Sequence, residues 1–165
     1  MSLCALLLGW LTPSVPAWAD FTGKVVGISD GDTITVLHQG VGERVRLSGI
    51  DCPEKRQPFG NRAKQLTSAL AFGESVTIVG GSRDRYGRTI GEVILPDGRH
   101  LTHALVEAGM FWWYRQYAPA DAVLAQLERE ARAEKRGLWA EPHPIPPWEW
   151  RKKQVARAAA YTKQQ

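Results

Sequence analysis

Three carboxylates and two arginines are the residues of this chain whose types and spacing could do chemistry. Asp32 precedes a run of alternating apolar and polar residues, and Asp51 follows a second such run. If the two runs pair as a hairpin, the end of the second returns beside the start of the first, so the two carboxylates should meet. Adjacent carboxylates repel each other, and a hard divalent cation with oxygen ligands removes that cost. The spacing therefore predicts a metal site at one end of a sheet.

Glu54, Arg46 and Arg88 are expected at the same place. Glu54 lies three residues after Asp51, across a Cys-Pro step that keeps the loop extended, and could orient or deprotonate a water molecule. Arg46 lies on the run that leads into Asp51, and Arg88 follows a tight turn. The two guanidinium groups could clamp a phosphate beside the cation, or simply form salt bridges with the carboxylates. Each aspartate alone would be an ordinary turn residue; the combination indicates function.

Aromatic and histidine residues form two further candidate sites. The run 111–114 holds four aromatic residues, with Tyr117 behind it. Such rings can stack on nucleic-acid bases, although strand geometry sends about half of them into a core. His100 and His103 have a spacing that could bind zinc, but no third ligand lies nearby in the sequence.

The elements that must position these residues follow from periodicity. Apolar alternation, β-branched residues and glycine-containing turns predict five strands, and a 3.6-residue period predicts three helices. Five strands with a helix after the third fit an α+β fold, a five-stranded OB-type Greek-key barrel with about three helices packed on it. The expected strands are 21–29, 33–37, 43–47, 75–79 and 89–95, and the expected helices are 58–72, 101–109 and 121–136.

Composition divides the chain into three parts. Residues 1–19 carry no charge and combine an apolar run with an Ala-Trp-Ala sequence before Asp20, which predicts a cleaved signal peptide and a secreted or periplasmic protein. Residues 20–139 form one domain, and residues 140–165 a stiff, Pro- and Trp-rich segment with a basic tail. From Arg151 to the end the chain carries five of its 21 basic residues and no acidic residue, and we expect a frayed end or non-specific help in binding nucleic acid.

Three motifs in order resemble the signature of the thermonuclease (staphylococcal-type nuclease) family. They are Asp30-Gly31-Asp32-Thr33, Arg46-Leu47-Ser48-Gly49-Ile50-Asp51-Cys52-Pro53-Glu54 and Asp84-Arg85-Tyr86-Gly87-Arg88. The resemblance covers about residues 21–139, and three motifs at sensible spacing are far more specific than any one.

The resemblance implies a role for each matching residue. Calcium would be bound by the carboxylates of Asp32 and Asp51 and by the backbone carbonyl of Cys52, where the family usually has Thr or Ala; a free thiol there is an oxidation liability. Glu54 would be the general base, Arg46 and Arg88 the phosphate clamps, and Asp30 an outer partner. Substrate contacts would come from Arg85 and Tyr86 and from the stacking tyrosines Tyr114 and Tyr117.

The implied activity is a calcium-dependent phosphodiesterase. It would cut DNA and RNA, favouring single-stranded or frayed regions, and would leave 3′-phosphate and 5′-hydroxyl ends. The protein would be a monomer without stable membrane association. Two alternatives stay open: a non-catalytic OB-type module that binds nucleic acid or protein, and a metal-dependent phosphoesterase for small nucleotides. The intact acidic and arginine set argues against the first.

Overall fold

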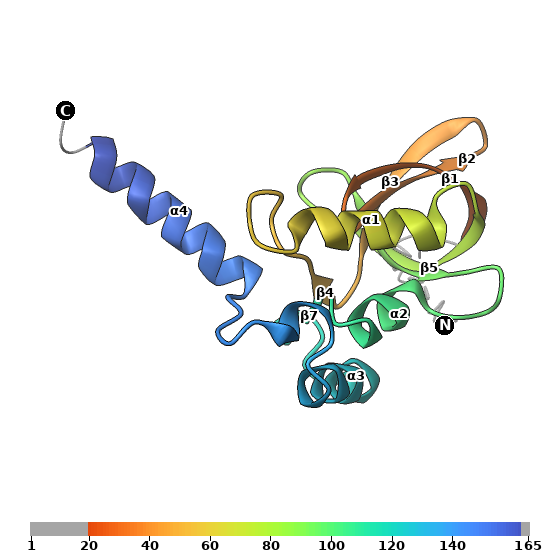
Figure 1. Ribbon diagram of the computed structural model, residues 1–165. Coiled ribbons are helices and arrows are strands. Elements are labelled where there is room, and N and C mark those ends of the chain that lie inside the picture. Colours follow the sequence, from red (N-terminus) through yellow and green to blue (C-terminus); the bar gives the residue numbers. More distant parts are fainter. Residues whose placement is uncertain (1–19, 163–165) are drawn as a thin grey trace, which may run out of the picture.

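The computed structural model describes residues 20–162, and the predicted signal peptide lies outside them. The architecture is a closed five-stranded barrel with helices packed against its side and one end (Figure 1). The barrel strands are β1 (Phe21–Asp30), β2 (Thr33–His38), β3 (Val41–Leu47), β5 (Ser75–Arg83) and β6 (Thr89–Ile94). Around the barrel their order is β1-β2-β3-β6-β5. The predicted α+β OB-type barrel is therefore confirmed.

The hairpin of β2 and β3 positions the aspartates of the candidate site. A two-residue turn at Gln39 and Gly40, both with positive φ, connects the strands and matches their twist. The register pairs Thr33 with Arg46 at the far end of the hairpin. β3 then pairs in parallel with β6, and β1 pairs antiparallel with β5, which closes the barrel. The aspartates that flank this hairpin therefore lie at one mouth of the barrel.

The barrel is filled by the inward-facing residues of its strands. Alternation sends Ile34, Val36 and Val45 inward, and each is fully buried. The helix α1 (Gly60–Ala71) covers one side, and α2 (Leu101–Glu107) packs below it. Leu101 and Leu105 of α2 are completely buried in the same core. This continuous core holds the strand ends, and the site they carry, in fixed positions.

A small second sheet and α3 (Ala122–Ala133) fix the chain around Asp51. The strands β4 (Ile50–Asp51) and β7 (Trp112–Trp113) pair antiparallel, with Asp51 opposite Trp112. The buried carboxylate of Glu128 on α3 accepts a hydrogen bond from the Trp113 N–H at 3.3 Å. Asp121 caps α3 by accepting from the Leu124 N–H at 2.9 Å. The predicted helix at 121–136 is confirmed, slightly shortened.

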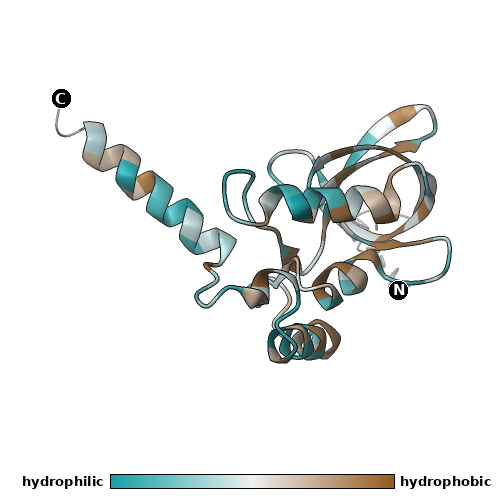
Figure 2. Cartoon of the chain, in the orientation of Figure 1, coloured by the Kyte–Doolittle hydropathy of each residue, from teal (hydrophilic) through white to brown (hydrophobic). Residues whose placement is uncertain are grey.

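The C-terminal part differs from the prediction. After a 3₁₀ turn at Gly137–Ala140, the proline-rich segment leads into α4 (Pro147–Thr162), so the described basic tail is a helix rather than a frayed end. The described residues therefore contain four α-helices instead of about three. In Figure 1 α4 projects away from the barrel, and in Figure 2 polar residues occupy much of its surface. No helix among residues 20–162 is long and apolar enough to cross a membrane.

Candidate active site

Asp32 and Asp51 meet at the mouth of the barrel. One nitrogen of Arg46, Nη2, lies 3.1 Å from Asp32 Oδ2 and 3.3 Å from Asp51 Oδ1. The Cys52 N–H donates to Asp32 Oδ2 at 3.3 Å, and the Thr33 hydroxyl donates to Asp32 Oδ1 at 3.0 Å. Both carboxylates are nearly inaccessible to solvent, with 6% and 2% of the residue exposed. The proximity predicted from the hairpin is confirmed.

Burial sets the electrostatics of these acids. It raises the pKa of Asp51, although Arg151 and Arg46 oppose the shift by stabilising the ionised form. Burial also raises the pKa of Asp30, with a further contribution from the charges of Asp32 and Glu54. Ionised carboxylates that are buried close together are stabilised by nearby positive charge. Part of that charge already comes from Arg46 and Arg151.

Glu54 lies on the loop between β4 and α1, beside the aspartates. Its backbone N–H donates to Gln57 Oε1 at 3.1 Å, and its carbonyl accepts from the Gln57 N–H at 2.7 Å. The loop rests directly on Gly60, where a Cβ would lie 2.1 Å from the Glu54 carbonyl oxygen. Gly60 is thus required for the loop path that presents Glu54.

Arg88 belongs to the turn between β5 and β6. The Asp84 carboxylate accepts from the backbone N–H groups of Tyr86 and Arg88, at 2.9 and 3.0 Å, and from Arg88 Nε at 2.7 Å. Arg88 Nη1 donates to Thr33 Oγ1 at 3.3 Å, which ties the turn to β2. Arg88 therefore reaches the mouth of the barrel without pairing with Asp32 or Asp51.

The aromatic candidates flank the same opening. The Tyr86 ring is 62% exposed and carries Arg85 over its face at 4.8 Å. Tyr114 and Tyr117 pack edge to face at 4.8 Å, and Tyr117 is 71% exposed. One face of Tyr114 is covered by Trp148, whose ring is nearly parallel at 5.1 Å. Only Tyr117 of this pair is widely accessible.

One open cavity of about 910 Å³ gathers the predicted residues. All ten residues named above as catalytic, substrate-binding or metal-binding line it: Asp32, Arg46, Asp51, Cys52, Glu54, Arg85, Tyr86, Arg88, Tyr114 and Tyr117. Carboxylates, guanidinium groups and aromatic rings therefore face a single space, which is large enough for part of a polymer.

The donor set fits a hard cation with few protein ligands. Among the described residues no group of three or more His, Cys, Asp or Glu side chains could hold a metal ion. Asp32 and Asp51 offer two carboxylates, and calcium completes its shell with carbonyl oxygens and water.

The Cys52 thiol is buried, burial raises its pKa, and it lies 3.8 Å from Asp30 Oδ1. Burial keeps this thiol protonated and shielded, which opposes the predicted oxidation liability.

The zinc alternative at His100 and His103 gains no support. The two rings stack at 4.5 Å, and His100 Nδ1 pairs with Glu92 at 3.1 Å. These residues belong to the described part of the chain, where no metal-binding cluster is found. They lie outside the cavity that holds the other candidates.

Arg151 is a residue of the site that could not be predicted from the sequence. It lies on α4, a hundred positions from Asp51, yet its guanidinium contacts Asp51 Oδ2 and Glu54 Oε1, both at 2.7 Å. It also lines the cavity. The only hints in the sequence were the excess of basic residues after Trp150 and the two tryptophans before them. Neither hint predicts a contact with an acid so distant in the chain.

Comparison with known proteins agrees with this geometry. The profile of the family described as "Staphylococcal nuclease homologue" matches residues 44–141. A protein of Shigella flexneri named "Micrococcal nuclease" is 46% identical over 151 residues, covering 86% of this chain and 87% of the relative. An "Uncharacterized endonuclease" of Escherichia coli O157:H7 is 46% identical over 133 residues, covering 81% and 86%.

A third relative extends the similarity to another bacterium. An "Uncharacterized endonuclease" of Haemophilus influenzae is 38% identical over 158 residues, covering 95% of this chain and 88% of the relative. The matched segment 44–141 contains Arg46, Glu54 and Arg88 together with the barrel strands around them. With a five-stranded barrel and the carboxylate–arginine cavity at its mouth, the chain belongs to the family of staphylococcal nuclease homologues.

Proposed function

We propose that this nuclease is a calcium-dependent phosphodiesterase that hydrolyses DNA and RNA and leaves 3′-phosphate and 5′-hydroxyl ends. The observation that carries the proposal is the convergence of Asp32, Asp51, Glu54, Arg46 and Arg88 on one open cavity. Two buried carboxylates can hold the cation, an acid beside them can accept a proton, and two arginines can bind a phosphate.

The chemistry assigns each group one task. Asp32, Asp51 and the Cys52 carbonyl would hold the calcium ion, which would supply positive charge to the phosphate when bound. Glu54 accepts a proton from the attacking water, whose oxygen forms the new bond to phosphorus. The bond from phosphorus to the 5′ oxygen breaks, and the leaving oxygen takes up a proton from solvent. Glu54 must leave its ion pair with Arg151 to act as this base.

The arginines stabilise the charge that develops on the phosphate oxygens. Attack at phosphorus increases negative charge on the non-bridging oxygens, and fixed guanidinium groups lower the energy of that state. Arg88 is anchored by Asp84 and Thr33 and so does not need to reorganise during the reaction, whereas Arg46 shares its ion-pair partners Asp32 and Asp51 with the proposed cation. Arg85 and Tyr86 lie beside them at the rim, where the substrate enters.

Tyr117 supports the proposed use of unpaired strands. Its exposed ring borders the cavity, and a base stacks on an aromatic face regardless of sequence. A duplex would have to fray before a base could reach it.

We further propose that the protein acts as a monomer, and that it is exported after cleavage before Asp20, on the pattern of residues 1–19. Mass spectrometry of the exported protein would locate its first residue.

The direct test is digestion of plasmid and single-stranded DNA with calcium, with magnesium and with a chelator. We expect cleavage that requires calcium, and products whose 3′ ends accept labelling only after phosphatase treatment. Glu54→Gln should lose most of this activity, because the amide cannot accept the proton. If a well-folded protein digests nothing in any metal, the non-catalytic binding module takes the place of the proposal.

A further inference from the structure

The helix α4 starts beside the candidate active site, and its Arg151 lines the cavity. Trp148 stacks on Tyr114 and meets Trp112 edge to face at 5.7 Å. The N–H groups of Glu149 and Trp150 donate to the Pro146 carbonyl, at 3.1 and 3.0 Å. These contacts fix the first turn, and therefore the direction in which the remaining helix leaves the mouth of the cavity.

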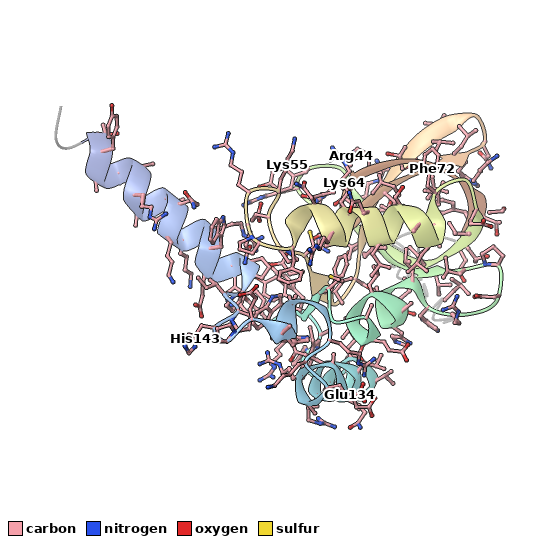
Figure 3. All side chains as sticks on the ribbon, in the orientation of Figure 1. Arg44, Lys55, Lys64, Phe72, Glu134 and His143 are labelled. Carbon is pink, nitrogen blue, oxygen red and sulfur yellow. The ribbon has the colours of Figure 1, made fainter. Side chains whose placement is uncertain are left out.

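Beyond its first turn α4 is basic and exposed. Every described residue from Arg151 to Thr162 is exposed, and Figure 3 shows side chains on this helix pointing into solvent along its length. Arg151, Lys152, Lys153 and Arg157 supply four positive charges, and no acidic residue follows Glu149. The chain before position 151 carries 16 basic and 17 acidic residues, so the positive charge of the molecule is concentrated here.

This helix lacks the packing that usually stabilises one. A helix of 16 residues that buries almost nothing is marginal in water, because helical stability in proteins comes mostly from packing of one face. Lys153 and Arg157 are four positions apart on the same face, where like charges destabilise a helix. A polyanion bound along α4 would remove this repulsion.

Arg151, at the end of the first turn of α4, neutralises acidic side chains that would repel a bound polyanion. Its guanidinium pairs with the carboxylates of Asp51 and Glu54, at 2.7 Å from each. These are the acids that would repel a phosphate at this edge of the cavity. Cations therefore line a path from the mouth of the cavity onto the exposed part of α4.

We propose that α4 is a binding arm for nucleic acid, in which Lys152, Lys153 and Arg157 hold the phosphate backbone of a strand that leaves the cavity. The proposal rests on the proposed function, because it takes the polymer cut in the cavity as the ligand of the arm. At 1.5 Å per residue the exposed part from Arg151 to Thr162 extends the binding surface by roughly 18 Å. Long strands then bind more tightly than short ones, although both are cut at the same site.

An anionic membrane is the competing partner for a basic helix. A helix that lies on a membrane needs an apolar face opposite its charges. The large apolar residues of the exposed part, Val155 and Tyr161, are six positions apart and so point about 120° away from each other. The charges, too, are spread around the axis. Phosphates along a nucleic-acid strand match this arrangement better than a flat lipid surface does.

The test compares two triple variants that remove the same charge. The first is Lys152→Gln, Lys153→Gln and Arg157→Gln, which leaves the anchored turn and Arg151 intact. The control is Lys24→Gln, Arg99→Gln and Arg129→Gln, at exposed positions that do not line the cavity. Circular dichroism of both variants checks that each is folded.

Binding is measured in chelator, so that no cleavage occurs, by fluorescence anisotropy of a labelled single strand of about 30 nucleotides at several salt concentrations. The α4 variant should bind on the order of 10- to 100-fold more weakly than wild type at about 0.1 M salt, with a salt slope shallower by roughly 2. Cleavage of an oligonucleotide of about four nucleotides should stay within about twofold of wild type, because it occupies the cavity alone.

Two results would overturn the proposal. One is equal loss of affinity in the α4 and control variants, which would indicate net charge rather than a binding arm. The other is unchanged DNA binding by the α4 variant together with lost binding to phosphatidylglycerol vesicles, which would assign the helix to membranes. Failure of the proposed cleavage activity would show separately, as wild-type protein that binds the long strand but cuts neither substrate in calcium.

Discussion

Arg46 and Arg88 face the same cavity, but different partners hold them. Arg46 lies against Asp32 and Asp51, the proposed calcium ligands, whereas Arg88 is held by Asp84 and Thr33. Arg88 contacts neither of these two carboxylates directly, and its one link to Asp32 runs through the Thr33 hydroxyl. The pair allows stabilisation of the phosphate to be separated from metal binding.

Arg88→Ala should lower kcat/KM by about 100-fold, equivalent to about 3 kcal/mol, because one fixed donor to the phosphate is lost. Calcium affinity, measured by titration calorimetry, should stay within about twofold of wild type. Arg83→Ala is the matched control, since Arg83 makes an exposed ion pair with Glu43. A loss of calcium binding in Arg88→Ala, or equal activity loss in the control, would contradict the assignment.

In the proposed function, Arg151 would compete with calcium for Asp51. Its two ion pairs engage Asp51 and Glu54, and calcium at Asp51 must displace one of them. Arg151→Gln should therefore tighten calcium binding several-fold, an effect limited by the partial exposure of the arginine. Lys152→Gln removes the same charge one residue away and should change the affinity little. Calorimetric affinities that are equal for the two variants would show that Arg151 does not compete.

At the scale of elements, the loop between β4 and α1 depends on one glycine. Gly60→Ala would force a Cβ to within 2.1 Å of the Glu54 carbonyl, so the loop must move. We expect at least a tenfold loss of activity and about 1–3 kcal/mol less stability in urea unfolding. Gly27→Ala is the control, because its Cβ would lie 3.4 Å from Thr35. Similar activity in both variants would mean that Glu54 tolerates a displaced loop.

The barrel could be predicted because its strands carry their own signals. Alternating residues such as Ile34 and Val36 mark the inward face, and the turn at Gly40 fixes the register that brings Asp32 and Asp51 together. By contrast, β4 and β7 have two residues each, too few to show a period. They are formed by tertiary contacts, including the hydrogen bond from Trp113 to Glu128.

The helix α4 was missed for a related reason. Its alanine-rich run 156–160 favours a helix, but the segment has no apolar stripe and follows four prolines, so it resembled a disordered tail. The docking of Trp148 on Tyr114 and of Arg151 on Asp51 depends on the folded barrel. Contacts between residues so far apart in sequence leave no local pattern to find.

At the scale of the whole molecule, one rigid barrel presents acids, arginines and aromatic rings in a single cavity, and one basic helix leaves from its edge. In the proposed function, calcium at Asp32 and Asp51 is the condition for cleavage. Neighbouring aspartates allow this to be tested without disturbing the fold. Asp30 lies beside the site, but its Oδ1 accepts from the Gly31 N–H at 2.8 Å, a bond that asparagine can keep.

The most direct measurement is the calcium dependence of single-stranded DNA cleavage for wild type, Asp51→Asn and Asp30→Asn. Asp51→Asn should need at least tenfold more calcium, or show no cleavage, because a charged oxygen ligand is lost. Asp30→Asn should keep a midpoint within about threefold of wild type, and chelator should abolish cleavage in all three. Cleavage that persists in chelator, or an unchanged calcium midpoint in Asp51→Asn, would contradict the account.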